Sequence, residues 1–417
     1  PALQSSRFDL NEALKEGRRG GTEGRGRARV RGLLMVSEVA LSLVLLIGAG
    51  LLVKSFFKLR NTDPGFDPSN TLTASLSLSP VRYDTDEKIN DFYRLLAERV
   101  RALPGVESVG AVVPLPLSEN NLSFSFTVVG QPPPPPGQGQ SASARFVTPD
   151  YFRAQRIPLR AGRVFTEADR AGAPGVIVVN EAFARRYLPG VEPLGQRLRL
   201  GLKSIEGEIV GVVGDIRGSS LARTPAPEYY VPESAVSFSD MTLVVRTASD
   251  PASLAPALRQ VVSEMDKDQP LYDVRTMEAL TARSVARQRF SMTLVGVFAV
   301  LAMLLSAVGI FSVMSFLVAQ RTHEIGIRMA LGARPGDILS MVVRHGVGLT
   351  LVGVAVGLAA ALALTRLMSG LLYEVSATDP VIYGGITALL AAVALLACYV
   401  PARRATKVDP LIALRYE

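Results

Sequence analysis

The stretch SMTLVGVFAVLAMLLSAVGIFSVMSFLVA, residues 291–319, contains no charged side chain from its first residue to its last. Roughly 20 apolar residues are enough to cross the hydrocarbon layer of a membrane as an α-helix, and that layer is about 30 Å thick. At about 1.5 Å per residue, this stretch would form a helix about 43 Å long. It therefore predicts a membrane-spanning helix that projects beyond the lipid.

Three further stretches have the same character. They are LLMVSEVALSLVLLIGAGLLV (33–53), GVGLTLVGVAVGLAAALALT (346–365) and PVIYGGITALLAAVALLACYV (380–400). The chain of 417 residues is 48% hydrophobic and only 20% charged, which is an apolar excess for a soluble protein of this length. The first stretch is preceded by a long polar segment and followed by no small-residue cleavage site, so we expect it to stay as an anchor rather than act as a signal peptide.

The formal net charge of +8 lies in three segments, 1–32, 320–345 and 401–417, and the rest of the chain is electrically balanced. These three segments share one side of the membrane if four helices cross it in order. The positive-inside rule then places them, with both termini, in the cytoplasm. Five basic residues flank the first two helices on the opposite side and count against this assignment, although long translocated domains tolerate such charges. They are Lys54, Lys58, Arg60, Arg287 and Arg289.

We therefore predict an α-helical bundle of four transmembrane segments, with a large extracytoplasmic α+β domain of two lobes inserted between the first and the second. The expected limits are a basic cytoplasmic tail (1–32), the first transmembrane helix (33–53), the outer domain (54–283), the second helix with its extracytoplasmic extension (284–319), a cytoplasmic loop (320–345), the third helix (346–366), a short outer loop (367–379), the fourth helix (380–400) and a cytoplasmic tail (401–417).

The outer domain has the patterns of a folded α+β unit. TLTASLSL (71–78) alternates polar and apolar residues as a half-buried strand does, and DEKINDFYRLLAERVRAL (86–103) follows with helical spacing. Both histidines, His323 and His345, lie in the cytoplasmic loop, and the single cysteine, Cys398, lies in the fourth apolar stretch. The outer domain therefore has no cysteine nucleophile, no histidine for acid–base work and no His or Cys metal ligand.

Other catalytic motifs are incomplete. Ser55 and Lys58 form an S-x-x-K pattern without the S-D-N and K-T-G motifs that accompany it in acyl-serine enzymes. No G-x-x-x-x-G-K-[ST] motif is present to bind nucleotide phosphates. The basic tract at 17–32 has no aromatic residue to stack on bases, so a polybasic tail at the lipid surface is favoured over a nucleic-acid-binding arm. We expect no catalytic residue, no metal and no cofactor.

The cytoplasmic loop contains AQRTHEIGIRMALGARPGDIL (319–339). We expect a short helix that Gly332 can end before Pro335 starts the next one. Its charges come from Arg321, Glu324 and Arg328, and its apolar surface from Ile325, Ile327, Met329 and Leu331. An exposed apolar strip of this kind favours contact with a partner or with lipid.

The sequence RTHEIGIRMALGAR (321–334), the four-helix layout and the ending PARRATKVDPLIALRYE (401–417) resemble the FtsX/MacB-type permeases of ABC transporters over the whole chain. LLYEVSATDP (371–380) resembles one subgroup, the acidobacterial duplicated orphan permeases. The opening PALQSSRFDLNEALKE (1–16) matches 401–416 at five positions without a gap. If the resemblance holds, residues 1–16 would end an upstream permease unit, and this chain would be the downstream one.

The resemblance implies a MacB-like periplasmic core domain and a permease subunit of the bacterial plasma (inner) membrane that is not itself an enzyme. A separate cytoplasmic ABC ATPase would dock on the loop, and its motion would pass through the helices to the outer domain for export or envelope work. The implied coupling residues are Arg321, Glu324, Ile325, Gly326, Arg328, Leu331 and Gly332. The other implied partners are a second permease unit (the upstream repeat or a homodimer), the lipid bilayer, and a periplasmic adaptor or cargo, but no nucleic acid.

Two alternatives to a coupled permease remain open on the residues alone. One is an ATPase-independent scaffold or sensor whose outer domain binds a ligand. The other is an envelope enzyme with an Asp/Glu or Ser/Lys site in the outer domain.

Two features inside the membrane are candidates for a functional role. Glu38 is the only charged residue within the four stretches, and it either reaches headgroup water and Arg31 or takes part in a helix interface. Gly353, Gly357 and Ala361 form a strip of small residues that lets helices approach closely, either within the bundle or toward a second unit.

Overall fold

The computed structural model describes residues 23–118, 120–132, 139–170, 172–203, 205–331, 333–368, 370 and 372–406. They divide into two compact units, which we call the helical unit (residues up to Lys58 and from Gln288 on) and the sheet unit (Leu59–Arg287). The two compared ends of the chain, 1–16 and 407–417, and Gly332 lie outside the described residues, and no structural statement is made about them.

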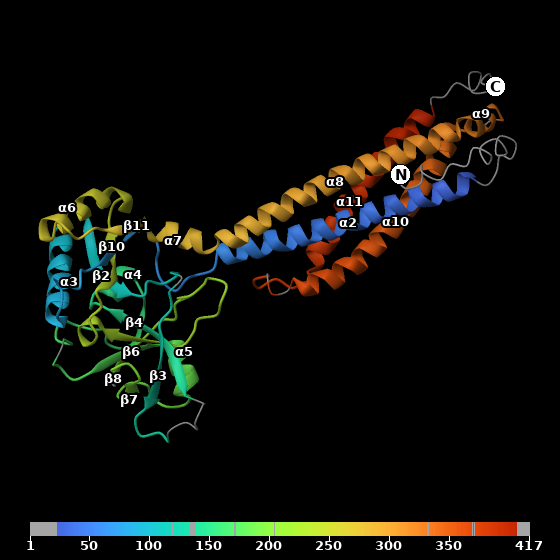
Figure 1. Cartoon of the computed structure of the whole chain (residues 1–417). Helices are drawn as coiled ribbons and strands as arrows, with labels where there is room; N and C mark the ends of the chain where they lie inside the picture. The colour runs from blue at the N-terminus through green and yellow to red at the C-terminus, as the bar shows by residue number, and fades with distance from the viewer. Residues whose placement is uncertain are drawn as a thin grey trace, which may run out of the picture. The chain divides into compact units, whose positions relative to one another are not determined.

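Among the residues that the structure describes, the helical unit is built from four long helices and a short one. The long helices are α2 (Glu23–Arg60), α8 (Ala286–Gln320), α10 (Pro335–Leu367) and α11 (Pro380–Ala405), and the short one is α9 (Thr322–Ala330) (Figure 1). Each of the four long helices is long and apolar enough to cross a membrane. Four apolar helices, with a large α/β domain between the first and the rest, confirm the fold class predicted from the sequence.

The helix boundaries follow from local chemistry. Pro335 and Pro380 stand in the first turns of α10 and α11, where a missing N–H costs nothing. The Asp379 side chain accepts a hydrogen bond from the Val381 N–H at 3.1 Å and so caps α11.

Helix α2 is the centre of the bundle. Its most apolar window is 56% buried inside the protein, against 17%, 28% and 17% for α8, α10 and α11. Val39, Leu43 and Ile47 of α2 pack against Ile310 and Met314 of α8 in one hydrophobic cluster with residues of α10 and α11. The three outer helices therefore keep most of their apolar surface for lipid or for other protein.

In the described part of the chain, the sheet unit contains eleven strands. They are β1 (Thr71–Ser77), β2 (Val106–Val113), β3 (Ser123–Val128), β4 (Gln140–Val147), β5 (Leu159–Gly162), β6 (Val176–Asn180), β7 (Arg197–Leu200), β8 (Glu206–Val213), β9 (Glu228–Pro232), β10 (Asp240–Thr247) and β11 (Tyr272–Thr276). They pair in the order β11-β1-β10-β2-β4-β3-β7-β8-β6-β9, with β5 on β8. In this order β4, β3, β7, β8, β6 and β9 are consecutive neighbours. Because β4 also pairs in parallel with β9, these strands form a closed ring.

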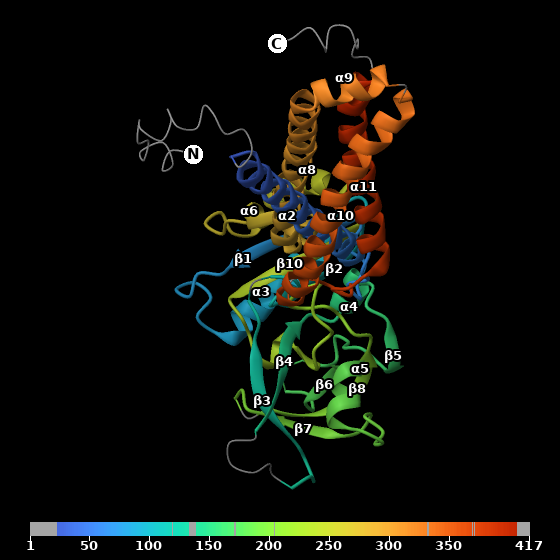
Figure 2. The ribbon, with the colours of Figure 1, turned by 90° about the vertical axis from the view of Figure 1, so that its right-hand side faces the viewer.

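Among the described residues of the sheet unit, two large hydrophobic cores mark two lobes. In the first lobe, α3 (Asp86–Arg101) and α6 (Ala255–Met265) cover strands β1, β2 and β10. In the second lobe, α5 (Glu181–Tyr187) lies beside the strands of the ring (Figure 2). Together they enclose a core rich in aromatic residues. Short helices α4 (Tyr151–Gln155) and α7 (Met277–Ser284) and the 3-10 turns η2 (Glu233–Ala235) and η3 (Pro251–Leu254) complete the unit.

Helix α3 shows how the sequence sets these elements. The Thr85 side chain accepts a hydrogen bond from the Lys88 N–H at the start of the helix, and two acidic residues occupy its first turn. Its buried residues recur at helical spacing and face the first core; they are Ile89, Phe92, Tyr93, Leu96 and Val100. One amphipathic helix thus covers one face of the sheet.

Candidate functional site

The turn from α8 through α9 to α10, residues 318–345, is the first candidate site, and we call it the elbow. Figure 2 shows α9 as a short crosspiece between the ends of α8 and α10. The helix begins with the Ile325 N–H donating to the Arg321 carbonyl at 2.8 Å and ends with the Leu331 N–H donating to the Ile327 carbonyl at 3.0 Å. The Arg334 N–H donates to Asp337 at 3.0 Å, which fixes the start of α10.

Helix α9 has an inward and an outward face. Ile325 is fully buried and packs with Ile338 of α10 in a small hydrophobic cluster, to which Val318, Met329 and Met341 also contribute. Gly326 is buried as well. The outward face carries Glu324, Ile327, Arg328 and Leu331, all of them exposed. Arg321, which precedes the helix, is exposed as well, but its side chain extends under the inward face. Ile325 therefore does not belong to an exposed apolar strip, and the outward apolar surface is narrower than the sequence suggested.

The charged groups on the outward face form a small network. Arg328 donates to Glu324 at 2.6 Å, one helical turn away, and also approaches the Met341 sulfur at 2.9 Å. Both charged side chains remain 47% exposed, so the pair contributes only about 0.3–0.5 kcal/mol to the helix. The pair orients two opposite charges toward solvent beside Leu331, whose side chain is 82% exposed.

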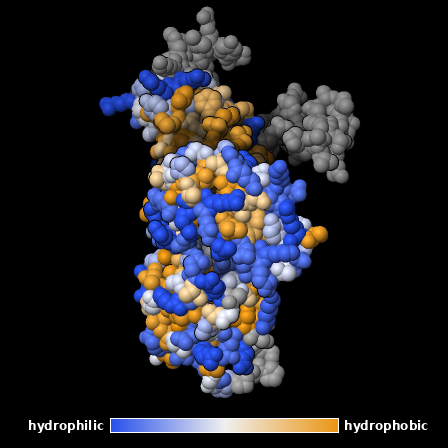
Figure 3. Space-filling model, turned by 90° about the vertical axis from the view of Figure 1, so that its left-hand side faces the viewer, coloured by the Kyte–Doolittle hydropathy of each residue, from blue (hydrophilic) through white to orange (hydrophobic). Residues whose placement is uncertain are grey.

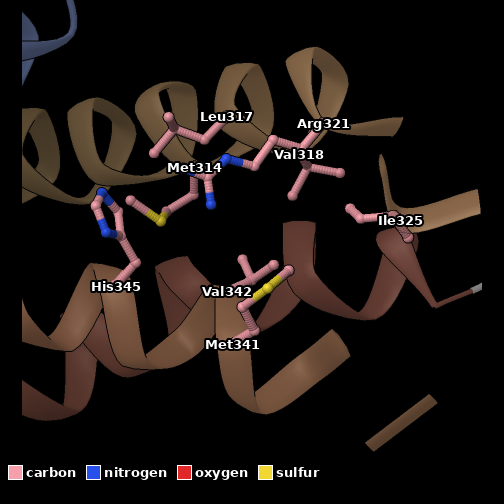
Figure 4. Close-up of a pocket in the computed structure, with 8 residues that line it drawn as sticks. All are labelled: Met314, Leu317, Val318, Arg321, Ile325, Met341, Val342 and His345. Atoms are coloured by element: carbon pink, nitrogen blue, oxygen red, sulfur yellow. The ribbon is translucent and has the colours of Figure 1, made fainter. Parts of the chain in front are cut away.

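A small hollow lies under the inward face (Figure 4). Its volume is about 20 Å³, which is room for about one water molecule. It is lined by Met314, Leu317 and Val318 from α8, by Arg321 and Ile325, and by Met341, Val342 and His345 from α10. Arg321 and His345 are its two ionisable members, and the other lining residues are apolar.

The residues of α10 that complete the elbow were missed by the sequence analysis. Ile338, Met341, Val342 and His345 recur at intervals of three and four residues and therefore lie on one face of the helix. That spacing could have identified them, because it places these residues on one face of α10, and one face of a helix that follows a turn packs against the turn. The elbow is thus a packed joint between three helices rather than a surface loop.

Glu38 lies at the interface of α2 and α8. Its carboxylate stands directly against Gly309 of α8, where a Cβ atom would overlap the carboxylate oxygens. Arg31 stacks instead over the Phe316 ring, with 3.8 Å between the guanidinium carbon and the ring centroid. Within the described ranges, no ion pair joins Arg31 to Glu38, so the geometry favours the helix-interface alternative.

The strip of small residues on α10 is turned toward α2. A Cβ at Gly353 would come within 2.9 Å of the Val39 side chain, and one at Gly357 within 3.0 Å of the Ala40 backbone. Ala361, one turn further, is fully buried. These contacts are made inside the bundle of a single chain.

The other end of α2 is fastened to the segment 372–379. Lys54 forms an ion pair with Asp379, and this hydrogen bond lowers the pKa of the Asp379 carboxyl below its ordinary value. Lys58 donates to the Glu374 carbonyl at 2.7 Å, and the Ser55 hydroxyl accepts from the Tyr373 N–H at 2.8 Å. Ser55 and Lys58 thus make structural contacts with their own chain.

In the sheet unit, the segment that follows α2 is clamped by one buried arginine. The Arg246 guanidinium donates to the carbonyls of Asp67 (2.7 Å), Ser69 (2.9 Å) and Ala154 (2.8 Å). Burial acts to raise the pKa of the Asp67 carboxyl, but the Ser69 hydrogen bonds and the charges of Arg246 and Arg156 outweigh it and lower that pKa. The chain therefore enters strand β1 from a rigidly held segment.

A groove of about 630 Å³ runs along α3 between the two lobes of the sheet unit. Figure 3 shows the face that carries α3 and α6, on which hydrophilic side chains are frequent. Glu233 lines the groove, and its Oε2 is shielded from solvent without a hydrogen-bond partner. Burial, with a smaller contribution from the nearby Glu167 carboxylate, raises the pKa of Glu233 to about 7. In the residues that the structure describes, no three His, Cys, Asp or Glu side chains converge on a possible metal site.

Comparison with known proteins gives two family matches. Residues 33–263 match the MacB-like periplasmic core domain, and residues 296–410 match the FtsX-like permease C-terminal region. Together these models cover the first apolar stretch, the sheet unit as far as residue 263, and the last three long helices from residue 296 on.

Several curated proteins are similar. The uncharacterized ABC transporter permease YknZ of Bacillus subtilis is 28% identical over 284 residues, which cover 66% of this chain and 70% of that protein. The macrolide export ATP-binding/permease protein MacB 2 of Aeromonas hydrophila is 28% identical over 283 residues, 64% of this chain and 42% of that protein. The pyoverdine export ATP-binding/permease protein PvdT of Pseudomonas syringae is 26% identical over 269 residues, 62% of this chain and 40% of that protein. This chain therefore spans less than half the length of the two export proteins.

One solved structure that is similar is the periplasmic region of MacB from Actinobacillus actinomycetemcomitans. It has 15% sequence identity and a TM-score of 0.37, and the match covers 54% of this chain and 97% of that one.

Proposed function

This chain belongs to the family of permeases that join a MacB-like periplasmic core domain to an FtsX-like permease C-terminal region, and we propose that it relays the motion of a separate cytoplasmic ABC ATPase to its outer domain. The work done there would be export or another task in the cell envelope. The observation that carries the proposal is the two-faced elbow, with charges and Leu331 outward and Ile325 locked inward.

The outward face of α9 suits a protein partner. It combines an exposed leucine with one acidic and one basic side chain one helical turn apart, and such a mixture can give both contact area and orientation. The coupling residues in our proposal remain Arg321, Glu324, Ile325, Gly326, Arg328, Leu331 and Gly332. Ile325 and Gly326 would act from inside the joint, and the exposed members of the set would meet the partner.

The inward face would pass on the displacement. Ile325 is packed against Ile338, so α9 can hardly move without moving the first turns of α10. Helix α8 runs without a break from Ala286 to Gln320. In the sheet unit, Arg246 holds the segment that follows α2 by hydrogen bonds to its carbonyl groups. That segment would therefore transmit the motion rather than change its own conformation. Packed joints and unbroken helices are what a mechanical relay requires.

The energy source would lie outside these 417 residues, because they contain no P-loop sequence. Two of the relatives are named ATP-binding/permease proteins, whereas YknZ is named a permease. We propose that this chain resembles the latter arrangement, with ATP hydrolysis on another subunit and no catalysis of its own.

Membrane topology, segment limits and subunit pairing belong to the same proposal. The four helices and the periplasmic core domain fit an inner-membrane protein with an extracytoplasmic domain. We propose that both termini are cytoplasmic, from the distribution of basic residues, and that the segment limits given from the sequence apply. The second permease unit would be an upstream repeat, as in the duplicated orphan permeases, or a second copy of this chain.

The test compares two equally exposed leucines. Leu331, at the end of α9, and Leu367, at the far end of α10, are both 82% exposed. The full-length protein and the variants Leu331→Asn and Leu367→Asn are purified from native membranes, and copurified ABC ATPases are identified and quantified. We expect Leu331→Asn to lose the ATPase and Leu367→Asn to retain it. Equal ATPase recovery from all three proteins contradicts the proposed docking surface.

The groove in the sheet unit favours a second candidate function, an ATPase-independent scaffold or sensor that binds a ligand. A volume of about 630 Å³ lies within the range of small-molecule sites, and the buried oxygen of Glu233 has no partner of its own. An intact phenotype after residues 321–334 are scrambled would support this candidate and would contradict the relay.

A further inference from the structure

The groove along α3 carries an excess of negative charge. Among the described residues, its lining contains seven carboxylate side chains and three guanidinium groups. A cleft lined mainly by one sign of charge attracts groups of the opposite sign. Acidic surfaces are common, however, so the partners of each carboxylate decide whether a ligand is needed.

Four of the seven carboxylates already have a cation from the protein itself. The pairs, with N–O distances of 2.6–3.1 Å, are Asp91 and Glu98 with Arg94, Asp150 with Arg101, and Asp169 with Arg163. These four carboxylates therefore give no reason to expect a bound ligand.

The other three carboxylates have no such cation. Within the described ranges, Glu87, Glu167 and Glu233 have no basic group at ion-pair distance. Arg170 is exposed near Glu167 in the chain and is likewise unpaired with any described carboxylate. The unpaired groups of the groove are thus three anions and one cation.

Glu233 differs from the other two because water does not reach all of its carboxylate. Glu87 and Glu167 are exposed, whereas Oε2 of Glu233 is shielded from solvent and has no hydrogen-bond partner in the described part of the chain. A buried charge without a partner is costly, and the Glu167 carboxylate is near enough to add repulsion. The groove therefore lacks one positively charged hydrogen-bond donor beside Glu233.

An ammonium group fits this position better than a metal ion does. Its N–H groups donate to carboxylate oxygens, and its charge would offset both Glu233 and Glu167. Mg²⁺ and Ca²⁺ take about six or more oxygen ligands, and no three His, Cys, Asp or Glu side chains converge among the described residues. The last torsion of a glutamate is soft, so a rotation of the carboxylate would turn Oε2 toward the bound group.

We propose that the groove binds a small organic amine, whose ammonium group is held by Glu233 and Glu167. A small molecule is favoured over a lysine of another protein, because the groove volume of about 630 Å³ lies within the range of small-molecule sites. The proposal rests on the ligand-binding function given above as the second candidate and does not depend on the relay. If no amine binds while the protein scrambled at 321–334 keeps its phenotype, only the ligand class is wrong.

Binding at this position should depend on pH. Burial raises the pKa of Glu233 to about 7, and a bound ammonium group favours the ionised carboxylate. The other charged groups of the groove are the ion pairs and the unpaired Glu87, Glu167 and Arg170, and the sheet unit contains no histidine. An alkylammonium group resembles the lysine side chain, with a pKa of about 10.4, and keeps its charge. Affinity should therefore rise from pH 5 to pH 8, with release of a proton on binding.

Glu98 is a matched control for Glu233. It lines the same groove, but it is paired with Arg94 and its side chain is 52% exposed. Glu233→Gln and Glu98→Gln each remove one negative charge from the groove with almost no change in side-chain size. Glu167→Gln removes the exposed member of the proposed pair and should have the smaller effect of the two glutamates that hold the amine.

The experiment titrates the full chain, in nanodiscs of phosphatidylcholine, with 1,5-diaminopentane by isothermal calorimetry at pH 5 and pH 8. The neutral 1,5-pentanediol lacks the charge, and tetramethylammonium has the charge without an N–H donor. We expect the diamine to bind more tightly than both, and more tightly at pH 8 than at pH 5. Its affinity should fall roughly tenfold or more in Glu233→Gln and stay unchanged in Glu98→Gln.

Three outcomes would overturn the proposal. Equal losses in Glu98→Gln and Glu233→Gln would show a general attraction of cations to an acidic surface. Tetramethylammonium binding as tightly as the diamine would show that no N–H donor is needed at Glu233. Displacement of the diamine by Mg²⁺ or Ca²⁺ at an equal concentration would make the groove a metal site. If Glu233→Gln fails to insert, the wild-type protein decides, since an affinity that does not rise from pH 5 to pH 8 also contradicts the proposal.

Discussion

Two ion pairs in this protein have the same separation and opposite surroundings. Arg145 and Glu228 in the sheet unit lie 2.6 Å apart with side chains only 2% and 4% exposed. Arg328 and Glu324 in the elbow also lie 2.6 Å apart, but each is 47% exposed. The buried pair joins β4 to β9 and receives a further hydrogen bond from the Tyr230 hydroxyl at 2.8 Å. The exposed pair crosses one turn of a nine-residue helix.

The difference teaches what each pair can do. A buried pair has lost its water, so each member depends on the other, and removal of one leaves a charge that the protein cannot solvate. An exposed pair keeps most of its hydration and holds its members only weakly, which leaves both charges available to a partner. The first pair therefore fixes a fold, and the second presents a surface.

The largest effect is expected from breaking the buried pair. Arg145→Met should destabilise the sheet unit by about 3–5 kcal/mol, because Glu228 would remain buried without a counter-charge. Limited proteolysis and thermal unfolding of the full chain measure this effect. A variant as stable as the wild type would show that the buried pair contributes no more to stability than the exposed pair does.

The inward side of the elbow should show the next largest effect. Ile325→Ala removes a fully buried side chain from the cluster with Ile338 and should cost about 2–4 kcal/mol of local stability. Hydrogen exchange of the α9 amide groups would report it as faster exchange. Ile327→Ala, on the outward face and 39% exposed, is the matched control and should change the exchange rates little.

Glu233 is a third case, a largely buried carboxylate with no ion-pair partner among the residues that the structure describes. Its pKa of about 7 in the folded protein exceeds the ordinary value of 4.5. Between pH 4.5 and 7 the folded state therefore holds more protons than the unfolded state, and stability falls as pH rises through that window. We expect the melting temperature of the sheet unit to decrease from pH 5 to pH 8, and Glu233→Gln to weaken that decrease. An unchanged pH dependence in the variant would show that other groups cause it.

The exposed pair should show the smallest effect on stability. Glu324→Arg should cost less than about 1 kcal/mol, because the lost pair is solvated. The same variant should uncouple ATP hydrolysis from movement of the outer domain in a reconstituted complex, as should a proline within 325–331. Coupling retained by a stably inserted Glu324→Arg protein would contradict the proposed relay.

The sequence predicted the elements of this fold well wherever one local pattern decides them. Apolar stretches long enough to span lipid are helices in the structure, and strand β1 and helix α3 begin at the residues that alternation and helical spacing indicated. The family could also be recognised, because the motif at 321–334 is local.

The arrangement of side chains was less accessible, because it depends on residues far apart in the chain. Lys54 meets Asp379 across 325 positions, and the β4–β9 pairing that brings Arg145 to Glu228 closes a ring that no local pattern encodes. Ile325 was expected on an exposed strip, since its own helix cannot show which side the neighbouring α10 will cover. Which side of a short helix is buried depends on the neighbouring elements that pack against it.

The central claim is that the outward face of the elbow receives a motor protein while the inward face is closed. A photo-crosslinking residue placed at Leu331 and, separately, at Ile325 in full-length protein in native membranes tests it directly. The account predicts that position 331 captures an ABC ATPase, with a yield that changes when ATP hydrolysis is blocked, and that position 325 captures only its own chain. ATPase capture at neither position, or equal capture at both, would contradict it.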